Sequence, residues 1–172
     1  GSGGTWKVAP GSPNNVATIT NSGLIVGISA GFTRFVFTRS ADGCQSNPSE
    51  KITVNGKPTV FVNGLKTICI NGNTQLFPSI GGSWVSNNPA IATVDNTGLV
   101  TGISEGTANF RFTNALTGCM SDNTENVTVS AYKNAEIIGS NTLCLGSYAR
   151  LSPSFGGTWK SNNPSIATVN NT

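Results

Sequence analysis

The sequence has no histidine and few charged residues. Of its 172 residues 10 are Lys or Arg and 7 are Asp or Glu, so 10% are charged and the formal net charge is +3. Histidine is a common general base and metal ligand, so the chain alone cannot build a Ser-His-Asp or Cys-His triad or a histidine-containing zinc site. This excludes most classes of enzyme and leaves open one that works with carboxylates alone.

Long apolar runs and clusters of basic residues are also missing. No stretch approaches the roughly 18 to 20 apolar residues that a membrane-spanning helix needs, and no signal peptide is evident. The Lys and Arg residues are scattered, and the aromatic residues do not alternate with them as in a groove for single-stranded nucleic acid. We therefore expect no membrane insertion in this segment and no nucleic-acid partner.

Small and polar uncharged residues are abundant instead. Gly, Asn and Thr occur 21 times each and Ser 19 times, which together is nearly half of the chain. Disordered segments usually combine low hydrophobicity with high net charge, whereas 37% of this sequence is hydrophobic, in short runs. The composition predicts folded β-structure.

The sequence repeats itself at a fixed spacing. Residues 81–97 return as 156–172 with 13 of 17 positions identical, and a more divergent copy begins at Gly3-Gly4-Thr5-Trp6. The cysteines follow the same spacing, since Cys44 and Cys119 are as far apart along the chain as Cys69 and Cys144. Self-similarity at this period of about 75 residues indicates a tandem array of structural units.

The ends of each unit are marked by strand-like segments and the polar residues after them. Residues 51–54 and 126–129 alternate as closing strands, followed by Asn55-Gly56-Lys57-Pro58 and Ser130-Ala131-Tyr132-Lys133. We predict a complete repeat at 58–131, with 1–57 as the C-terminal part of a preceding repeat and 132–172 as the N-terminal part of a following one.

The complete repeat shows strand patterns and no helical period. Short strands are predicted at 59–62, 67–70, 74–77, 83–86, 91–94, 99–103 and 107–113. Residues 95–98 read as a hairpin turn with Gly98 where a positive φ is needed, and Ala108, Phe110 and Phe112 form the inward face of the last of these strands. Some seven short strands in about 75 residues predict a small antiparallel β-sandwich.

A family resemblance rests on two consecutive segments. Trp84 to Val94 reads W-V-S-N-N-P-A-I-A-T-V, and Gly98 to Ala108 reads G-L-V-T-G-I-S-E-G-T-A. This pattern closely resembles the bacterial immunoglobulin-like domain, group 2, and covers the chain as one full and two partial copies. The first copy departs from it where Lys7 to Pro13 replace the S-x-N-P turn. The resemblance implies an all-β fold of tandem immunoglobulin-like antiparallel sandwiches.

The cysteine pair of the repeat is similar to that in tandem arrays of very large surface adhesins of gliding Bacteroidota. This resemblance implies a cell-surface or extracellular filament, exported by the type IX route, that mediates attachment or gliding motility. The expected partners are neighbouring repeats, surface polysaccharide or other filaments. The alternative function is that of a carbohydrate- or host-ligand-binding module.

One tryptophan occurs in each copy, at Trp6, Trp84 and Trp159. An exposed aromatic ring could stack on a sugar ring, whereas in immunoglobulin-like sandwiches a tryptophan on the third strand fills the core. Its place in the same motif of every copy favours the core.

The four cysteines could be reactive thiols, metal ligands or disulfide partners. They include no C-x-x-C pair, and two thiols per repeat cannot form a tetrahedral site alone. We predict a Cys69–Cys119 disulfide that closes a loop of about 50 residues and stabilises the repeat by about 4 kcal/mol. Cys44 and Cys144 would then pair with cysteines of the adjoining repeat halves, in an oxidising, exported location.

The carboxylates do not recur with the repeat. Asp95 corresponds to Thr20 and Asn170, and Glu105 corresponds to Ala30, whereas repeated chemistry would need repeated residues. Asp95 with Asn96, or Asp122 with Asn123, offers too few oxygens for a tight calcium cage, and no EF-hand loop is present. We predict no catalytic residue, no metal and no cofactor.

Overall fold

The computed structural model describes residues 3–132, 134–153 and 156–171; residues 1–2, 133, 154–155 and 172 lie outside this description. The described residues form strands and turns and no helix, which confirms the predicted all-β fold class. The chain divides into two compact units, residues 1–129 and 130–172.

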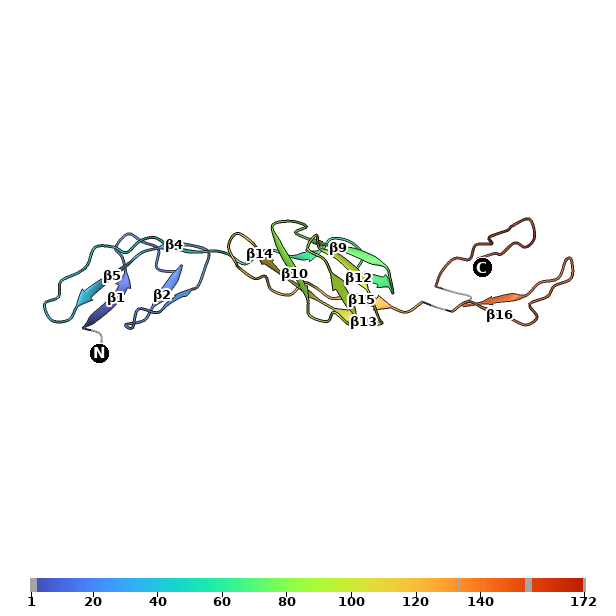
Figure 1. Ribbon diagram of the computed structural model, residues 1–172, viewed down its shortest axis with the longest axis horizontal. Helices are drawn as coiled ribbons and strands as arrows, with labels where there is room; N and C mark the ends of the chain where they lie inside the picture. Colours follow the sequence, from blue (N-terminus) through green and yellow to red (C-terminus); the bar gives the residue numbers. More distant parts are fainter. Residues whose placement is uncertain (1–2, 133, 154–155, 172) are drawn as a thin grey trace. The chain divides into compact units, whose positions relative to one another are not determined.

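The strands of the predicted complete repeat, residues 58–131, are short (teal to orange in Figure 1). They are β7 (Phe61–Val62), β8 (Thr67–Cys69), β9 (Asn73–Phe77), β10 (Gly82–Ser86), β11 (Ala92–Val94), β12 (Leu99–Gly102), β13 (Gly106–Ala108), β14 (Phe110–Asn114) and β15 (Val127–Ser130). They hydrogen-bond in the orders β11-β12-β9-β7, β13-β15-β8 and β10-β14. This arrangement is the predicted sandwich.

The core of the complete repeat is built from side chains that alternate along these strands. Phe110 is fully buried, and Leu76 and Phe112 are each 1% exposed. The cluster comprises Val62, Ile68, Leu76, Trp84, Ala92, Val100, Ala108, Phe110, Phe112, Val127 and Val129. The predicted inward face of Ala108, Phe110 and Phe112 is confirmed, because a strand turns every second side chain to the same face.

The strand predicted at 107–113 is interrupted once. β13 ends at Ala108 and β14 begins at Phe110, with β13 paired to β15 and β14 paired to β10. The chain therefore changes its partner strand at Asn109. The hairpin between β11 and β12 turns at Gly98, whose φ of +79° is the left-handed conformation that glycine adopts without strain.

Residues 3–57 repeat the second half of this pattern. They form β1 (Gly4–Val8), β2 (Ala17–Ile19), β3 (Ile25–Gly27), β4 (Gly31–Thr33), β5 (Phe35–Arg39) and β6 (Ile52–Val54), which pair as β1–β5, β2–β3 and β4–β6. The Trp6↔Phe37 register of β1–β5 matches Trp84↔Phe112 of β10–β14. Residues 3–57 hold no counterparts of β7, β8 and β9.

The unit of residues 130–172 contains the first half of the strand pattern of the repeat. Its strands β16 (Glu136–Ile138) and β17 (Arg150–Ser152) pair antiparallel, with Ile137 opposite Leu151. This is the register of β7 and β9, where Val62 lies opposite Leu76. The segment from Trp159 onward keeps turns but has no strand among its described residues.

Candidate functional site

Trp84 lies inside the sandwich, on β10. Its side chain is 5% exposed, and its indole Nε1 donates a hydrogen bond to the Pro78 carbonyl oxygen at 2.9 Å. Its ring packs on Phe112 with centroids 5.1 Å apart and planes tilted by 55°. The apolar ring and its single polar atom are thus both satisfied by the core, and the ring offers no face to a ligand.

The other two tryptophans share parts of this environment. Trp6 packs on Phe37 with ring centroids 5.1 Å apart, tilted by 53°. Trp159 donates from Nε1 to the Pro153 carbonyl oxygen at 3.1 Å, as Trp84 does to Pro78. Both side chains are half-buried, since each lies in a segment that holds only part of the repeat.

All four cysteines lie among the described residues, and all four are free thiols. The expected Cys69–Cys119 disulfide is therefore absent. The sheet topology gives the physical reason, because it holds the two cysteines at different ends of the sandwich.

Cys69 lies at the end of the repeat where the chain leaves it. A Cβ added to Gly102 would meet the Cys69 carbonyl oxygen and Val129 Cγ1, each at 2.9 Å. Val129 in turn pairs with Gly106 at the start of β13. Cys69 is thus close to the exit strand β15.

Cys119 lies at the other end of the repeat. Its carbonyl oxygen accepts a hydrogen bond at 3.0 Å from the backbone N of Asn114, which is the last residue of β14. From Gly106 to Asn114 the strands β13 and β14 extend the chain by about 25 Å, at about 3.3 Å per residue. A disulfide needs Cα atoms within about 7 Å, so this topology keeps Cys69 and Cys119 from pairing within one repeat.

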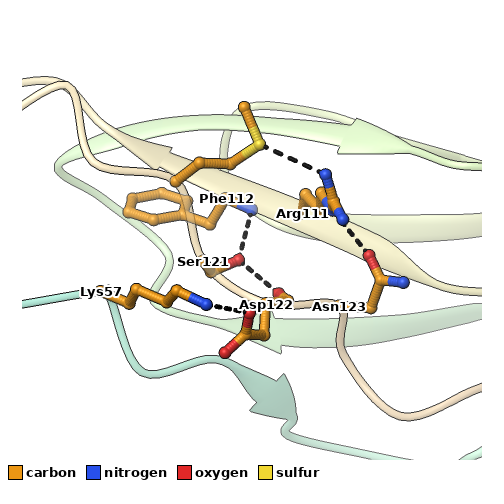
Figure 2. A network of polar contacts seen from close by, with 7 residues as sticks. Lys57, Arg111, Phe112, Ser121, Asp122 and Asn123 are labelled. Carbon is orange, nitrogen blue, oxygen red and sulfur yellow. Dashed lines mark hydrogen bonds and ion pairs between the residues drawn. The ribbon is translucent and has the colours of Figure 1, made fainter. Parts of the chain in front are cut away.

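The segment after Cys119 lines β14 through hydroxyl groups (Figure 2). Ser121 Oγ accepts a hydrogen bond from Phe112 N at 3.0 Å and donates one to the Asp122 carbonyl oxygen at 2.6 Å. Thr124 Oγ1 accepts from Phe110 N at 3.1 Å in the same way. Side-chain oxygens thus satisfy the edge N–H groups that a neighbouring strand would otherwise occupy.

This hydroxyl pattern recurs in the first copy of the repeat. Ser46 Oγ accepts from Phe37 N and Ser49 Oγ from Phe35 N, each at 3.0 Å. Our sequence reasoning missed these residues because isolated Ser and Thr resemble turn formers. The usable signal was their recurrence at the period of the repeat, as Cys-x-Ser-x-x-Ser/Thr-Glu beginning at Cys44 and Cys119.

The acidic residues serve turns and surface ion pairs. Asp95 Oδ1 accepts from the Thr97 hydroxyl at 2.7 Å, from Thr97 N at 2.8 Å and from Leu99 N at 3.0 Å, and these bonds, the hydroxyl first, lower the pKa of Asp95. The Arg39 guanidinium beside Asp42 lowers the pKa of that carboxyl. The carboxylates of Asp95 and Asp42 are thus each fixed within a local turn.

The described residues offer neither a metal site nor a membrane-spanning helix. Among residues 3–132, 134–153 and 156–171, no group of three or more Cys, Asp or Glu side chains is placed to hold a metal ion. The described residues also include no helix that is long and apolar enough to span a bilayer.

The entry end of the complete repeat carries one ion pair and one thiol. Lys57, in the connection after β6, pairs with Asp122 at 2.5 Å, as Figure 2 shows. Cys119 Sγ lies 4.0 Å from the Asn55 carbonyl oxygen in the same connection. These contacts place the segment that follows β14 beside the end of β6.

Solved structures of surface proteins share some similarity with the chain. A fragment of intimin in complex with the intimin-binding domain of the translocated intimin receptor is 18% identical, with a TM-score of 0.40, and the alignment covers 78% of this chain. Domains 4 and 5 of the S-layer protein SbsC are 14% identical with a TM-score of 0.26, over 77% of this chain and 72% of that one. The chain spans about half (53%) of the intimin fragment.

No curated protein matches the chain. A family model does match, since residues 79–118 fit the bacterial Ig-like domain (group 2). The matched residues run from the turn before β10 to the turn after β14, within the complete repeat. The fold is thus all-β and Ig-like, and residues 79–118 are similar in sequence to the bacterial Ig-like domain, group 2.

Proposed function

We propose that this chain is a segment of a tandem array of Ig-like domains that serves as a stalk or filament of a cell-surface or extracellular adhesin. Its role would be mechanical and spatial and not enzymatic. The proposed boundaries are 1–57 for part of one repeat, 58–131 for a complete repeat and 132–172 for part of the next. The observation that carries the proposal is the path of the chain through the complete repeat.

The chain enters and leaves the complete repeat at different ends. At the entry, Lys57 contacts Asp122 in the segment that follows β14. At the exit, Val129 of β15 pairs with Gly106, at the far end of the β13–β14 run. Repeats of this geometry would extend a chain lengthwise, and tension would act along the strands.

The surface composition suits a long extended protein. Few charges and many Ser, Thr and Asn side chains keep the surface hydrated with little dependence on ionic strength. The more specific parts of the proposal, which are adhesion in gliding motility and export by the type IX route, rest on the sequence resemblance. Neighbouring repeats, surface polysaccharide and other filaments are the proposed partners.

One observation favours the alternative of a carbohydrate-binding module. Phe61 and Phe77 stack on the surface with ring centroids 4.9 Å apart and planes at 18°, and the residues are 43% and 45% exposed. Exposed aromatic faces can bind sugar rings. The pair does not recur, because its counterparts across β16 and β17 are Glu136 and Ser152.

A glycan array on the whole chain separates the two functions. The stalk predicts no saturable, sugar-specific binding to the chain or to the variant Phe77→Ser, which carries the residue found at Ser152. Binding that is saturable in the native chain and lost in Phe77→Ser would support the binding module instead. Val85→Ala, which alters an exposed side chain (61%) on β10, is the matched control.

A further inference from the structure

The cysteines of the repeat occupy two equivalent kinds of turn. In the turn after the second strand, Gly72 N donates to the Cys69 carbonyl oxygen at 2.8 Å, and Ser147 N donates to that of Cys144 at 3.0 Å. In the turn after the β14-type strand, the carbonyl oxygens of Cys44 and Cys119 accept from the strand end at 2.9 and 3.0 Å. We call the first pair exit cysteines and the second pair entry cysteines.

Each repeat thus carries one cysteine at each end. The exit cysteine Cys69 lies beside Gly102 and Val129, whereas the entry cysteine Cys119 lies beyond Asn114. At the first junction, within residues 1–129, the exit end of one repeat meets the entry end of the next. Every such junction would therefore bring together one exit and one entry cysteine from different repeats.

At the first junction, the connection that follows β6, the entry cysteine Cys119 lies against the preceding repeat. Cys119 Sγ is 4.0 Å from the carbonyl oxygen of Asn55, which directly follows β6. β6 pairs with β4 as β15 pairs with β13, with Val54 opposite Gly31 and Val129 opposite Gly106. Cys119 therefore faces the exit end of the preceding repeat.

The exit end of the preceding repeat is packed like the exit end of the complete repeat. A Cβ added to Gly27 would meet Val54 Cγ1 at 2.9 Å, as one added to Gly102 would meet Val129 Cγ1 at 2.9 Å. At Gly102 the turn that bears Cys69 is also in contact, so a complete preceding repeat would place its exit cysteine beside Gly27.

We propose that consecutive repeats are joined by a disulfide between the exit cysteine of one repeat and the entry cysteine of the next. The two partners belong to different repeats, and the bond crosses the junction between them. This inference rests on the tandem array proposed above.

The bond needs an oxidant of the disulfide class. Two thiols lose two protons and two electrons as the S–S bond forms, and the disulfide of a thiol–disulfide oxidoreductase accepts the electrons and becomes a dithiol. All four thiols are accessible for this exchange, since Cys119 is partly exposed and the other three are exposed.

Junction disulfides would change how the array bears tension. The load would pass through a bond to Cys119, along the connecting chain to Cys144, and then through the next bond. The core strands between Cys69 and Cys119 lie outside that path. The strands β9 to β14 would be shielded from unfolding under load, whereas β15 would still bear it.

The test uses the whole chain extended in register by its own sequence. Residues 57–78 are added before Gly1 and residues 98–131 after Thr172, so that three repeats are complete and six cysteines are present. After air oxidation in the presence of a disulfide oxidoreductase, free thiols are alkylated and peptides are mapped without reduction.

The proposal predicts two bonds and two alkylated thiols per molecule. The added copy of Cys69 should pair with Cys119, and Cys69 with the added copy of Cys119, while Cys44 and Cys144 stay free. Cys44→Ser should leave both bonds, and Cys119→Ser should remove one. Three bonds within repeats, including Cys69–Cys119, or six free thiols would overturn the inference.

Failure of this inference can be told apart from failure of the proposed array. Circular dichroism and thermal unfolding of the reduced, extended chain report whether three β-sandwich repeats form without any disulfide. If they form and the junction bonds do not, only the present inference fails. If no tandem sandwich forms, the proposed function fails with it.

Discussion

Residues 130–172 match the first half of the complete repeat in strand pairing but differ from it in packing. β7–β9 and β16–β17 pair in the same register, and Trp84 and Trp159 both donate to the carbonyl oxygen of a proline six residues earlier. Yet Val62 is 7% exposed and its counterpart Ile137 is 51% exposed, while Ile68 is 4% and Leu143 is 51% exposed.

The difference between the two regions lies in what covers the strands. Residues 132–172 correspond to 57–97 and therefore hold no counterpart of Val100, Phe110, Phe112 or Val129. The local sequence sets the pairing and turns of β7, β9, β16 and β17, whereas the burial of these strands needs the second half of the repeat. Residues 130–172 thus pair their strands without burying them.

The largest predicted effect compares two equivalent leucines. Leu76→Ala should lower the free energy of unfolding of the complete repeat by about 2–5 kcal/mol, because Leu76 is 1% exposed and its truncation leaves a cavity. Leu151→Ala, at the partly exposed counterpart, should cost less than about 1 kcal/mol. Urea unfolding of the whole chain measures both, and equal losses would contradict the comparison.

A smaller effect is expected at the hydroxyl-lined edge of β14. Ser121→Ala should destabilise the complete repeat by about 1–3 kcal/mol, because it leaves Phe112 N without its acceptor at a buried position. Urea unfolding measures the loss. Ser130→Ala changes a half-buried serine on β15 and should cost clearly less.

The ion pair at the entry should matter less still. Lys57 and Asp122 have side chains 66% and 79% exposed, so Lys57→Ala should change the unfolding free energy by at most about 1 kcal/mol. The effect should shrink further when the salt concentration rises to about 1 M. A salt-independent loss well above that value would show that the junction is a major source of stability.

The smallest effect concerns pH and the turn at Asp95. Because folding lowers the pKa of Asp95, its stabilising contribution is present above the ordinary carboxyl pKa and is lost as pH falls through the lowered value. Asp95→Asn gives the complete repeat the residue of the third copy, Asn170. Thermal unfolding should show a shallower loss of stability below about pH 4 in this variant, and an unchanged acid profile would contradict the role.

The sequence predicted the strands of the complete repeat and much of its core. Alternation located Ala108, Phe110 and Phe112, and the turn at Gly98 followed from its need for a positive φ. The ends of the sandwich could not be predicted, because a period gives distance along the chain and not position in space. The predicted Cys69–Cys119 disulfide therefore joins two cysteines that lie at opposite ends of the repeat.

The features that escaped prediction depend on strands that are distant in sequence. The change of partner strand at Asn109 follows from how β13 and β14 meet two different neighbours. The role of Ser121 depends on its lying against β14, nine residues earlier. Neither contact leaves a pattern within a single copy.

Native-state hydrogen exchange of the whole chain, read by mass spectrometry, tests most directly that the second half of the complete repeat buries and protects the strands of its first half. The account predicts that amides of β7 and β9 exchange only through unfolding of the complete repeat, together with those of β12 and β14. The matching amides of β16 and β17 should exchange at least about 100-fold faster, since no core covers them. Equal protection of β9 and β17 would contradict the account.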